Sequence, residues 1–217
     1  MIQDIWPKHL DNQYKNLKPG KGDTVFYFQG SSLLARPSGH FNSQNPEENV
    51  LIYPQYDEFV QGIKSSYGDK AVDNFEFIYL LSIDEEHFFL ARKTGSLERG
   101  TFLGEMADSA VHKDMYSFVR GYEFIGVDSF RKAQPREHAY AAITACHLYG
   151  WYRDNHFCGR CGKPLKHDDK QRMLRCYCCK NMVFPKICPA VIVAVTDKDR
   201  ILLTKYAGRT YRNYALI

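Results

Sequence analysis

Residues 156–180 read HFCGRCGKPLKHDDKQRMLRCYCCK and hold five of the seven cysteines of the chain. Four of these cysteines form two C-x-x-C pairs, Cys158 with Cys161 and Cys176 with Cys179, and 14 residues separate the pairs. This spacing is typical of a zinc ribbon, in which each pair supplies two thiolates to one ion. Four sulfurs at about 2.3 Å close the tetrahedral shell and leave no position for a reacting water. The pattern therefore predicts a structural zinc ion.

The second pair allows another choice of ligand, because Cys178 lies between Cys176 and Cys179. The two-residue spacing of the first pair favours Cys176 with Cys179, which leaves Cys178 as a spare, oxidisable thiol. A redox role for a C-x-x-C pair is the alternative, but no thioredoxin-like βαβ pattern surrounds either pair. Gly159 and Gly162 are expected to ease the tight backbone of the first turn.

A segment this short needs the metal in order to fold. Below about 40 residues a chain cannot bury enough apolar surface to be stable alone, whereas zinc binding stabilises small modules by roughly 10 to 16 kcal/mol. We expect the ribbon to span residues 156–186. His156 and His167 should face solvent, because four thiolates already saturate the ion.

The composition of the whole chain is that of an ordinary globular protein. Of its 217 residues, 44% are hydrophobic and 25% charged, and the formal net charge is +4. This charge is too small to identify a nucleic-acid binder by itself. The odd number of cysteines favours metal binding in a reducing compartment, and the sequence shows neither a signal peptide nor an apolar run of about 18 residues. We therefore expect a soluble, cytoplasmic protein without membrane contact.

Residues 1–133 are expected to form a β-rich domain, since the 15 Tyr and 14 Phe of the chain are more typical of sheets than of a helical bundle. Two pairs of apolar runs predict antiparallel hairpins: TVFYF with SSLLARP (24–28 and 31–37), and FEFIYLL with HFFLAR (75–81 and 87–92). Gly30 supplies the first turn. The polar residues 40–49 predict a loop.

Residues 134–155 predict a helix that links this domain to the ribbon. Pro135 suits its first turn, and apolar residues recur at spacings of three and four. The apolar stripe consists of Ala139, Ala142, Ile143, Cys146 and Tyr149. We expect Cys146 to be a small core residue, and His138 and His147 to be surface or hydrogen-bonded residues rather than metal ligands.

Residues 187–217 are expected to begin a further domain. AVIVAV at 190–195 is a continuous apolar run that is typical of a buried strand. ILLT at 201–204 predicts the next strand, after a tight turn at 197–199, and a last apolar stretch begins at Tyr214.

The order of these parts resembles the NADH pyrophosphatase branch of the Nudix hydrolases. The resemblance is carried by WYRDNHFCGRCG, the four-cysteine ribbon, FPKICPAVIVAV, DKDRILLTKYAG and NYALI. It implies an enzyme that splits the pyrophosphate of NADH or NAD into a mononucleotide and AMP, and that in some members removes NAD caps from RNA. It also implies a homodimer, a structural zinc ion, and Mg²⁺ or Mn²⁺ held by glutamates of the Nudix box.

The resemblance places the Nudix box just after the strand that ends at Ile217, and no substitute box occurs upstream: Arg136-Glu137 has no pair of glutamates one turn on. We therefore name no catalytic residue and expect the 217-residue chain alone to be inactive, since positioning divalent ions at a pyrophosphate needs several carboxylates. The expected fold class is α+β: the β-rich domain, the linking helix, the four-cysteine zinc ribbon and the first strands of an incomplete Nudix α/β/α sandwich.

Two residues correspond to substrate-binding positions of the branch. Phe184 stands where the branch has an aromatic residue, commonly Tyr, that contributes to the nucleotide pocket. Arg131 corresponds to a basic residue near the substrate. Packing against Pro185 is the other interpretation of Phe184.

The ribbon is also basic, which supports a second hypothesis: a non-enzymatic zinc-ribbon module that binds RNA or a protein partner. A solvated face that offsets the charge of the zinc tetrathiolate is the alternative, because Asp168 and Asp169 interrupt the patch. The basic residues are Lys163, Lys166, Lys170, Arg172, Arg175, Lys180 and Lys186.

Overall fold

The computed structural model describes residues 4–39, 50–94, 118–205 and 214–215, without the side chains of Arg131, Lys132 and Ala215. The chain divides into two compact units, Met1–Pro185 and Lys186–Ile217. The described residues form mixed α and β structure made mostly of strands, which agrees with the predicted α+β class. The predicted loop at 40–49 lies outside the described residues.

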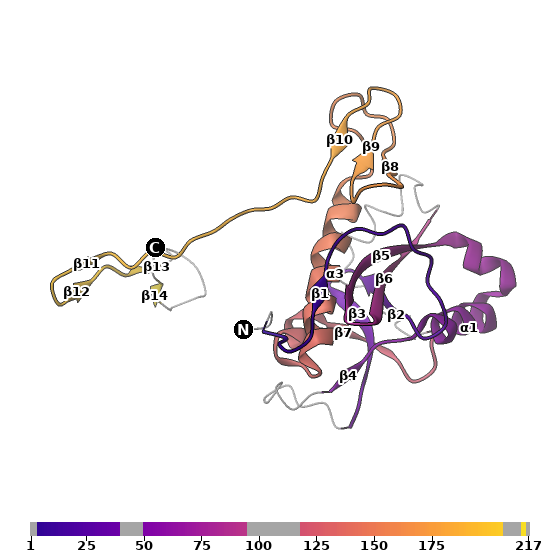
Figure 1. Ribbon diagram of the computed structural model, residues 1–217, viewed down its shortest axis with the longest axis horizontal. Helices are drawn as coiled ribbons and strands as arrows, with labels where there is room; N and C mark the ends of the chain where they lie inside the picture. The colour runs from indigo at the N-terminus through magenta and orange to yellow at the C-terminus, as the bar shows by residue number, and fades with distance from the viewer. Residues whose placement is uncertain (1–3, 40–49, 95–117, 206–213, 216–217) are drawn as a thin grey trace. The chain divides into compact units, whose positions relative to one another are not determined.

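The first unit is built on a seven-stranded sheet (Figure 1). Its strands are β1 (Leu10–Asp11), β2 (Thr24–Gln29), β3 (Ser32–Pro37), β4 (Leu51–Ile52), β5 (Phe75–Ile83), β6 (Glu86–Lys93) and β7 (Glu123–Gly126). The order is β1-β5-β6-β2-β3-β4, and β7 also pairs with β3. β2 and β6 run parallel, and the other pairs are antiparallel.

Both predicted hairpins are confirmed. β2 pairs with β3 around Gly30, which has a φ of 58°. β5 pairs with β6 around Asp84, which has a φ of 51°. Glycine and aspartate are among the residues that adopt this left-handed conformation most readily, so both turns form at the positions that the sequence indicates.

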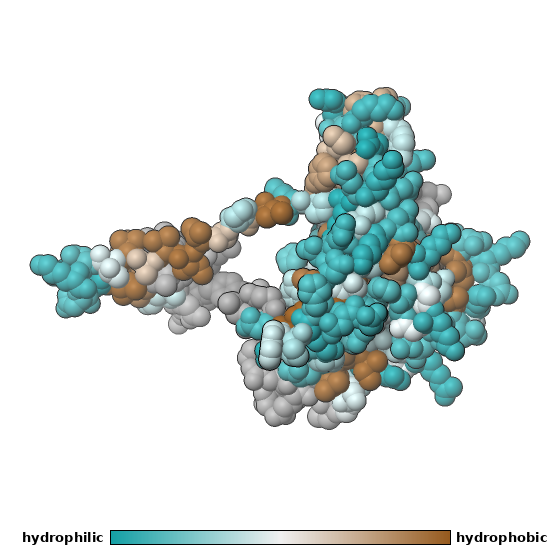
Figure 2. All heavy atoms as spheres, in the orientation of Figure 1, coloured by the Kyte–Doolittle hydropathy of each residue, from teal (hydrophilic) through white to brown (hydrophobic). Residues whose placement is uncertain are grey.

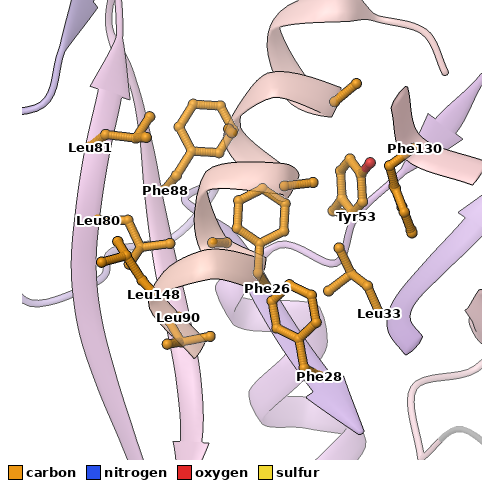
Figure 3. Close-up of a cluster of buried hydrophobic side chains, with 14 of the residues drawn as sticks. Phe26, Phe28, Leu33, Tyr53, Leu80, Leu81, Phe88, Leu90, Phe130 and Leu148 are labelled. Atoms are coloured by element: carbon orange, nitrogen blue, oxygen red, sulfur yellow. The ribbon is translucent and has the colours of Figure 1, made fainter. Parts of the chain in front are cut away.

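The central strands are buried on both faces, which explains why they read as apolar runs rather than as alternating patterns. Along β6, Phe88 and Leu90 belong to one core cluster, while Phe89 and Ala91 belong to a second cluster on the other face. Figure 3 shows the first cluster, in which Phe26 from β2 and Phe88 are stacked with ring centroids 5.7 Å apart.

Among the described residues, one α-helix packs on each face of the sheet. Phe59 and Ile63 of α1 (Tyr56–Tyr67) enter the second cluster, and α1 leads into the 3-10 helix η2 (Asp69–Asn74). α3 (Arg136–Asp154) follows the 3-10 helix η4 (Val127–Lys132) and contributes to the first cluster.

The predicted linking helix is confirmed as α3, but the face that it buries is shifted from the predicted stripe. Ala139 and Ala142 are buried as expected. Ile143, Cys146 and Tyr149 are only partly buried at the margin of the cluster. The buried positions are Ala139, Ala141, Ala142, Ala145, Leu148, Trp151 and Tyr152. The prediction missed part of this face because it did not count the large aromatic residues near the end of the helix.

The ribbon follows α3 and contains a three-stranded antiparallel sheet of β8 (Lys166–His167), β9 (Leu174–Arg175) and β10 (Met182–Val183). The sheet order is β10-β9-β8. Each strand has only two residues, so backbone pairing alone contributes little to its stability.

The prediction of a buried strand at 190–195 is wrong. These residues form no strand, and Val191 and Ile192 are 83% and 79% exposed. An apolar run becomes a buried strand only when other elements cover it, and the described part of the second unit supplies two small ladders instead. They pair β11 (Thr196–Asp197) with β12 (Arg200–Ile201), and β13 (Thr204–Lys205) with β14 (Tyr214–Ala215).

In the second unit the predicted turn forms, but the predicted strand after it does not form as one element. A turn at Lys198, whose φ is 55°, joins β11 to β12, as predicted for 197–199. The predicted strand at 201–204 is wrong as one element, because Ile201 ends β12, Thr204 begins β13, and Leu202 and Leu203 lie in no strand. Its apolar side chains are exposed, and Figure 2 shows them as brown atoms.

Within the described residues, no helix has the length and apolarity that a membrane span requires.

Candidate metal centre

Two backbone turns of the same design present the cysteine pairs. In the first, the amide of Cys158 donates to the carbonyl of Lys163, and the amide of Gly162 donates to the carbonyl of Cys158, both at 2.8 Å. In the second, the amide of Cys176 donates to Asn181 and the amide of Lys180 donates to Cys176, both at 2.9 Å. The two turns therefore match residue by residue.

The correspondence between the turns favours Cys179 over Cys178 as the second ligand of its pair. Cys161 is the third residue after the first cysteine of its turn, and Cys179 has the same place in the second turn. The residue after each has a positive φ, 71° at Gly162 and 62° at Lys180. The expectation that Gly162 eases the first turn is confirmed, whereas Gly159 has no positive φ, so the backbone there does not require a glycine.

The turns bring four sulfur atoms together, from Cys158, Cys161, Cys176 and Cys179. All lie within 4.8 Å of one another. Sulfur atoms of Cys158 and Cys179 are 3.5 Å apart, and those of Cys161 and Cys176 are 3.4 Å apart, too far for disulfides. Zn–S bonds of about 2.3 Å in a tetrahedron separate the sulfurs by about 3.8 Å. The arrangement could therefore hold one ion such as zinc.

Hydrogen bonds around Cys158 favour the thiolate that a metal requires. The sulfur accepts from the backbone amide of Arg160 at 3.4 Å and from the side-chain amide of Asn181 at 3.5 Å. Burial opposes ionisation of this thiol, but the hydrogen bonds outweigh it and lower the pKa of Cys158 to about 6. A backbone hydrogen bond from Cys179 likewise lowers the pKa of Cys176.

The other cysteines lie outside this cluster. Cys178 is exposed beside it, and Cys188 is exposed in the second unit. Cys146 packs partly buried against the core of the first unit, near the expected place, and burial raises the pKa of its thiol.

The ribbon sheet contacts the rest of the first unit through one row of side chains. His167, Leu174 and Val183 are direct partners across the three strands, so they lie on the same face of the sheet. Leu174 is 2% exposed within the first core cluster, and Val183 packs against that cluster. The ribbon is thereby attached to the sheet domain by apolar packing.

A polar cluster surrounds this contact. The guanidinium group of Arg172 donates to the backbone carbonyl of Leu80 and lies 5.9 Å from the centre of the Tyr14 ring. Arg92 lies 5.0 Å from the centre of the Tyr152 ring and donates to Glu76 at 2.7 Å. Arg172, which the sequence placed in a basic surface patch, is thus a structural contact.

The prediction that His156 and His167 face solvent is wrong, since both are half-buried. The His167 ring lies against Tyr152, with centroids 5.6 Å apart, and its Nδ1 is 3.5 Å from the hydroxyl of Tyr14. Its place in the inward row of β8 explains the burial, because a strand directs alternate residues to opposite faces. Burial lowers the pKa of both histidines.

The predictions for the two helix histidines are confirmed. His138 lies 2.6 Å from a carboxylate oxygen of Glu86, and its ring packs against Phe88. His147 is exposed. Neither belongs to the cysteine cluster.

The buried position of His167 predicts a pH dependence of stability. Its pKa in the folded state lies below the ordinary 6.5, so below that pH the unfolded chain binds more protons than the folded chain. The free energy of unfolding should therefore fall as the pH drops from about 6.5 towards the lowered pKa. Urea unfolding between about pH 7.5 and 5.5 should show a steeper fall for the wild type than for His167→Gln. The control His147→Gln should keep the wild-type slope, and equal slopes in all three proteins would contradict the assignment.

The two predicted substrate-binding residues lie in different elements. Phe184 follows β10 directly and is 51% exposed. Arg131 lies in η4, and its side chain is outside the described residues. Among the described residues, the four cysteines are the group of metal-ligating side chains that lies within binding distance of one ion, so the structure offers no separate carboxylate site for Mg²⁺ there.

No family model matches the chain. Curated proteins match a part of it: the NAD-capped RNA hydrolase NudC of Pseudomonas aeruginosa is 38% identical over 55 residues, and that of Salmonella typhi is 36% identical over 59 residues. In that segment the chain is similar to NudC. The NudC of Pseudomonas putida is also 38% identical, over 61 residues. The predicted resemblance to the NADH pyrophosphatase branch is thereby confirmed.

These matches cover 25 to 28% of this chain and 20 to 23% of the NudC chains. The chain thus spans about a fifth of the length of the curated relatives that it matches. The similarity to NudC supports membership of a hydrolase family. It is limited to a segment of 55 to 61 residues.

Proposed function

We propose that the chain, with its β-rich domain, linking helix and zinc ribbon, is a catalytically incomplete part of a Nudix-type enzyme that hydrolyses the pyrophosphate of NADH or NAD, and that the complete enzyme also removes NAD caps from RNA. The local identity of 34 to 38% with NAD-capped RNA hydrolases is the observation that carries this proposal. The cluster of four cysteines supports it, because the resemblance includes a ribbon of this kind.

In this proposal Cys158, Cys161, Cys176 and Cys179 hold one zinc ion, whose role is structural. Four thiolate ligands leave no open position at the metal, and the matched backbone turns supply all four. The ion would fix the ribbon at the end of α3, beside the sheet domain. Mg²⁺ or Mn²⁺, when bound by the complete enzyme, would supply the charge neutralisation that phosphoryl chemistry needs.

The substrate contacts of this chain are part of the same proposal. Phe184 is half exposed at the end of β10, where a flat ring is accessible to a nucleotide base. Arg131 would supply a positive charge to the substrate. We also propose a cytoplasmic homodimer for the complete enzyme, as the resemblance implies.

The 217-residue chain alone is expected to show no turnover. Purified, zinc-loaded chain would be incubated with NADH or an NAD-capped RNA and Mg²⁺ or Mn²⁺, and AMP or uncapped RNA would be measured by chromatography. We expect no product above the protein-free rate, because the sequence contains no Nudix box. Product formation that scales with protein concentration would contradict this part of the proposal.

A chimera tests the proposed role of the ribbon. Residues 156–185 would replace the aligned residues of Pseudomonas aeruginosa NudC, with the same chimera carrying Cys158→Ser as the matched control. We expect the first chimera to bind one zinc ion and hydrolyse NAD-capped RNA, and the control to lose both properties. A chimera that binds zinc stoichiometrically but does not hydrolyse would count against the proposal.

A further inference from the structure

The ribbon sheet has a second face, opposite the row that packs on the sheet domain. Lys166, Arg175 and Met182 are direct partners across β8, β9 and β10, so their side chains share this outer face. Met182 is 51% exposed, in contrast to Leu174 of the inner row at 2%.

Aromatic rings extend the outer face at the ends of two strands. Tyr177 is 55% exposed, and its ring lies 5.9 Å from the ammonium group of Lys166, which places both side chains on the same side of the sheet. Phe184 is two residues beyond Met182 and is 51% exposed. Phe184 comes directly after the end of β10, so a second exposed ring lies next to the outer face in the chain.

The charge around this face is positive. Residues 156–185 contain seven Lys or Arg and two Asp, an excess that outweighs the roughly two negative charges of a zinc tetrathiolate. Asp168 forms an ion pair with Arg175 at 3.0 Å and accepts hydrogen bonds from backbone amides of its own loop. The exposed cations of the ribbon are Arg160, Lys163, Lys166, Lys170 and Lys180.

Figure 2 shows apolar and hydrophilic atoms mixed over the ribbon rather than one apolar patch. Exposed rings interleaved with cations are the composition of surfaces that bind single-stranded nucleic acid, in which bases stack on aromatic side chains and cations contact phosphates. An apolar protein partner would instead favour a continuous apolar surface with few charges at its centre.

We propose that this outer face, formed by Lys166, Tyr177, Met182 and Phe184, binds single-stranded RNA. Three strands about 4.8 Å apart give a surface about 10 Å wide, which accommodates one or two stacked bases. Bases in a duplex are already stacked on one another and cannot lie on Tyr177 or Phe184. The inference shares Phe184 with the substrate contacts of the proposed function, and the rest of the face is argued from the geometry of the ribbon.

Binding would be measured with the zinc-loaded 217-residue chain and a fluorescently labelled, uncapped single-stranded RNA, by fluorescence anisotropy at several salt concentrations. We expect Tyr177→Ala to weaken binding between about fivefold and a hundredfold, because a stacking partner is lost. Tyr177→Phe should bind like the wild type, since it keeps the ring.

Lys166→Ala should act differently from Tyr177→Ala. Removing one phosphate contact should reduce the slope of log affinity against log salt by about 0.7, whereas Tyr177→Ala should leave that slope unchanged. Tyr67→Ala and Lys70→Ala are the matched controls, because both side chains are exposed and lie outside the ribbon. A zinc content of one ion per chain in each variant verifies that the ribbon is folded.

Three results would overturn the proposal: no RNA binding by the wild type at low salt, equal affinity for a duplex RNA of the same length, or equal losses in Tyr177→Ala and Tyr67→Ala. Because the RNA carries no NAD cap and no hydrolysis is measured, these outcomes are independent of the hydrolase proposal. If the chain bound RNA through this face but the chimera with NudC were inactive, the RNA-binding proposal would stand and the hydrolase proposal would fail.

Discussion

Replacing Cys158 with serine is expected to abolish stoichiometric metal binding and to unfold the ribbon. A serine hydroxyl does not ionise near neutral pH, so the site would lose one of its four thiolates and the hydrogen bonds from Arg160 and Asn181 that stabilise it. Metal binding supplies roughly 10 to 16 kcal/mol of folding free energy in small zinc modules, far more than three two-residue strands can supply.

Zinc content and amide hydrogen exchange measure this effect. In Cys158→Ser, or after chelation of the metal, the amides of Gly162, Cys176 and Lys180 should lose protection, because their hydrogen bonds close the two turns. Amides of β2 and β6 in the sheet domain should stay protected. Cys178→Ser is the matched control, since this exposed thiol lies outside the cluster, and it should keep the wild-type zinc content. A metal-free chain with a fully protected ribbon would refute the proposed role of the ion.

Phe88→Ala should destabilise the sheet domain by about 3 to 5 kcal/mol. Phe88 is fully buried, is stacked on Phe26 and lies against His138 of α3, so its loss opens a cavity between the sheet and the helix. The size of this loss approaches the whole stability of a marginal domain, which is typically about 5 to 15 kcal/mol.

Urea unfolding followed by circular dichroism measures this loss. Tyr67→Ala removes an aromatic ring of similar size that is 64% exposed and has an edge-to-face contact with Phe118, so it should lower the free energy of unfolding by less than about 1.5 kcal/mol. Zinc content should remain stoichiometric in Phe88→Ala under conditions in which the domain is folded. If Phe88→Ala and Tyr67→Ala lowered the free energy of unfolding equally, Phe88 would not be a core residue between β6 and α3.

Local patterns in the sequence predicted the parts of the fold that local interactions determine. Gly30 and Asp84 mark the two hairpin turns, and the spacing of Cys158, Cys161, Cys176 and Cys179 predicts the cluster because each turn is closed by hydrogen bonds within six residues. The parallel pairing of β2 with β6 was not predicted, since it joins segments about 60 residues apart and no local pattern specifies it.

Features that depend on coverage by distant residues were missed or wrong. α1 was not predicted, because its only buried side chains are Phe59 and Ile63 and most of its other residues are polar. For the run at 190–195, burial was predicted but not found. Its apolarity predicts burial, but it does not identify which residues would cover it. The orientation of His167 depends on strand register, and a shift of one residue would have exposed it.

The contact between Arg172 and the carbonyl of Leu80 joins residues 92 positions apart in the chain. During synthesis the sheet and α3 leave the ribosome before the second cysteine pair does, and protein domains generally fold from the N-terminal end first. The strands β9 and β10 and the second cysteine pair are therefore synthesised after the strand that carries Leu80, so the four-sulfur site can be complete only once the partner of Arg172 already exists.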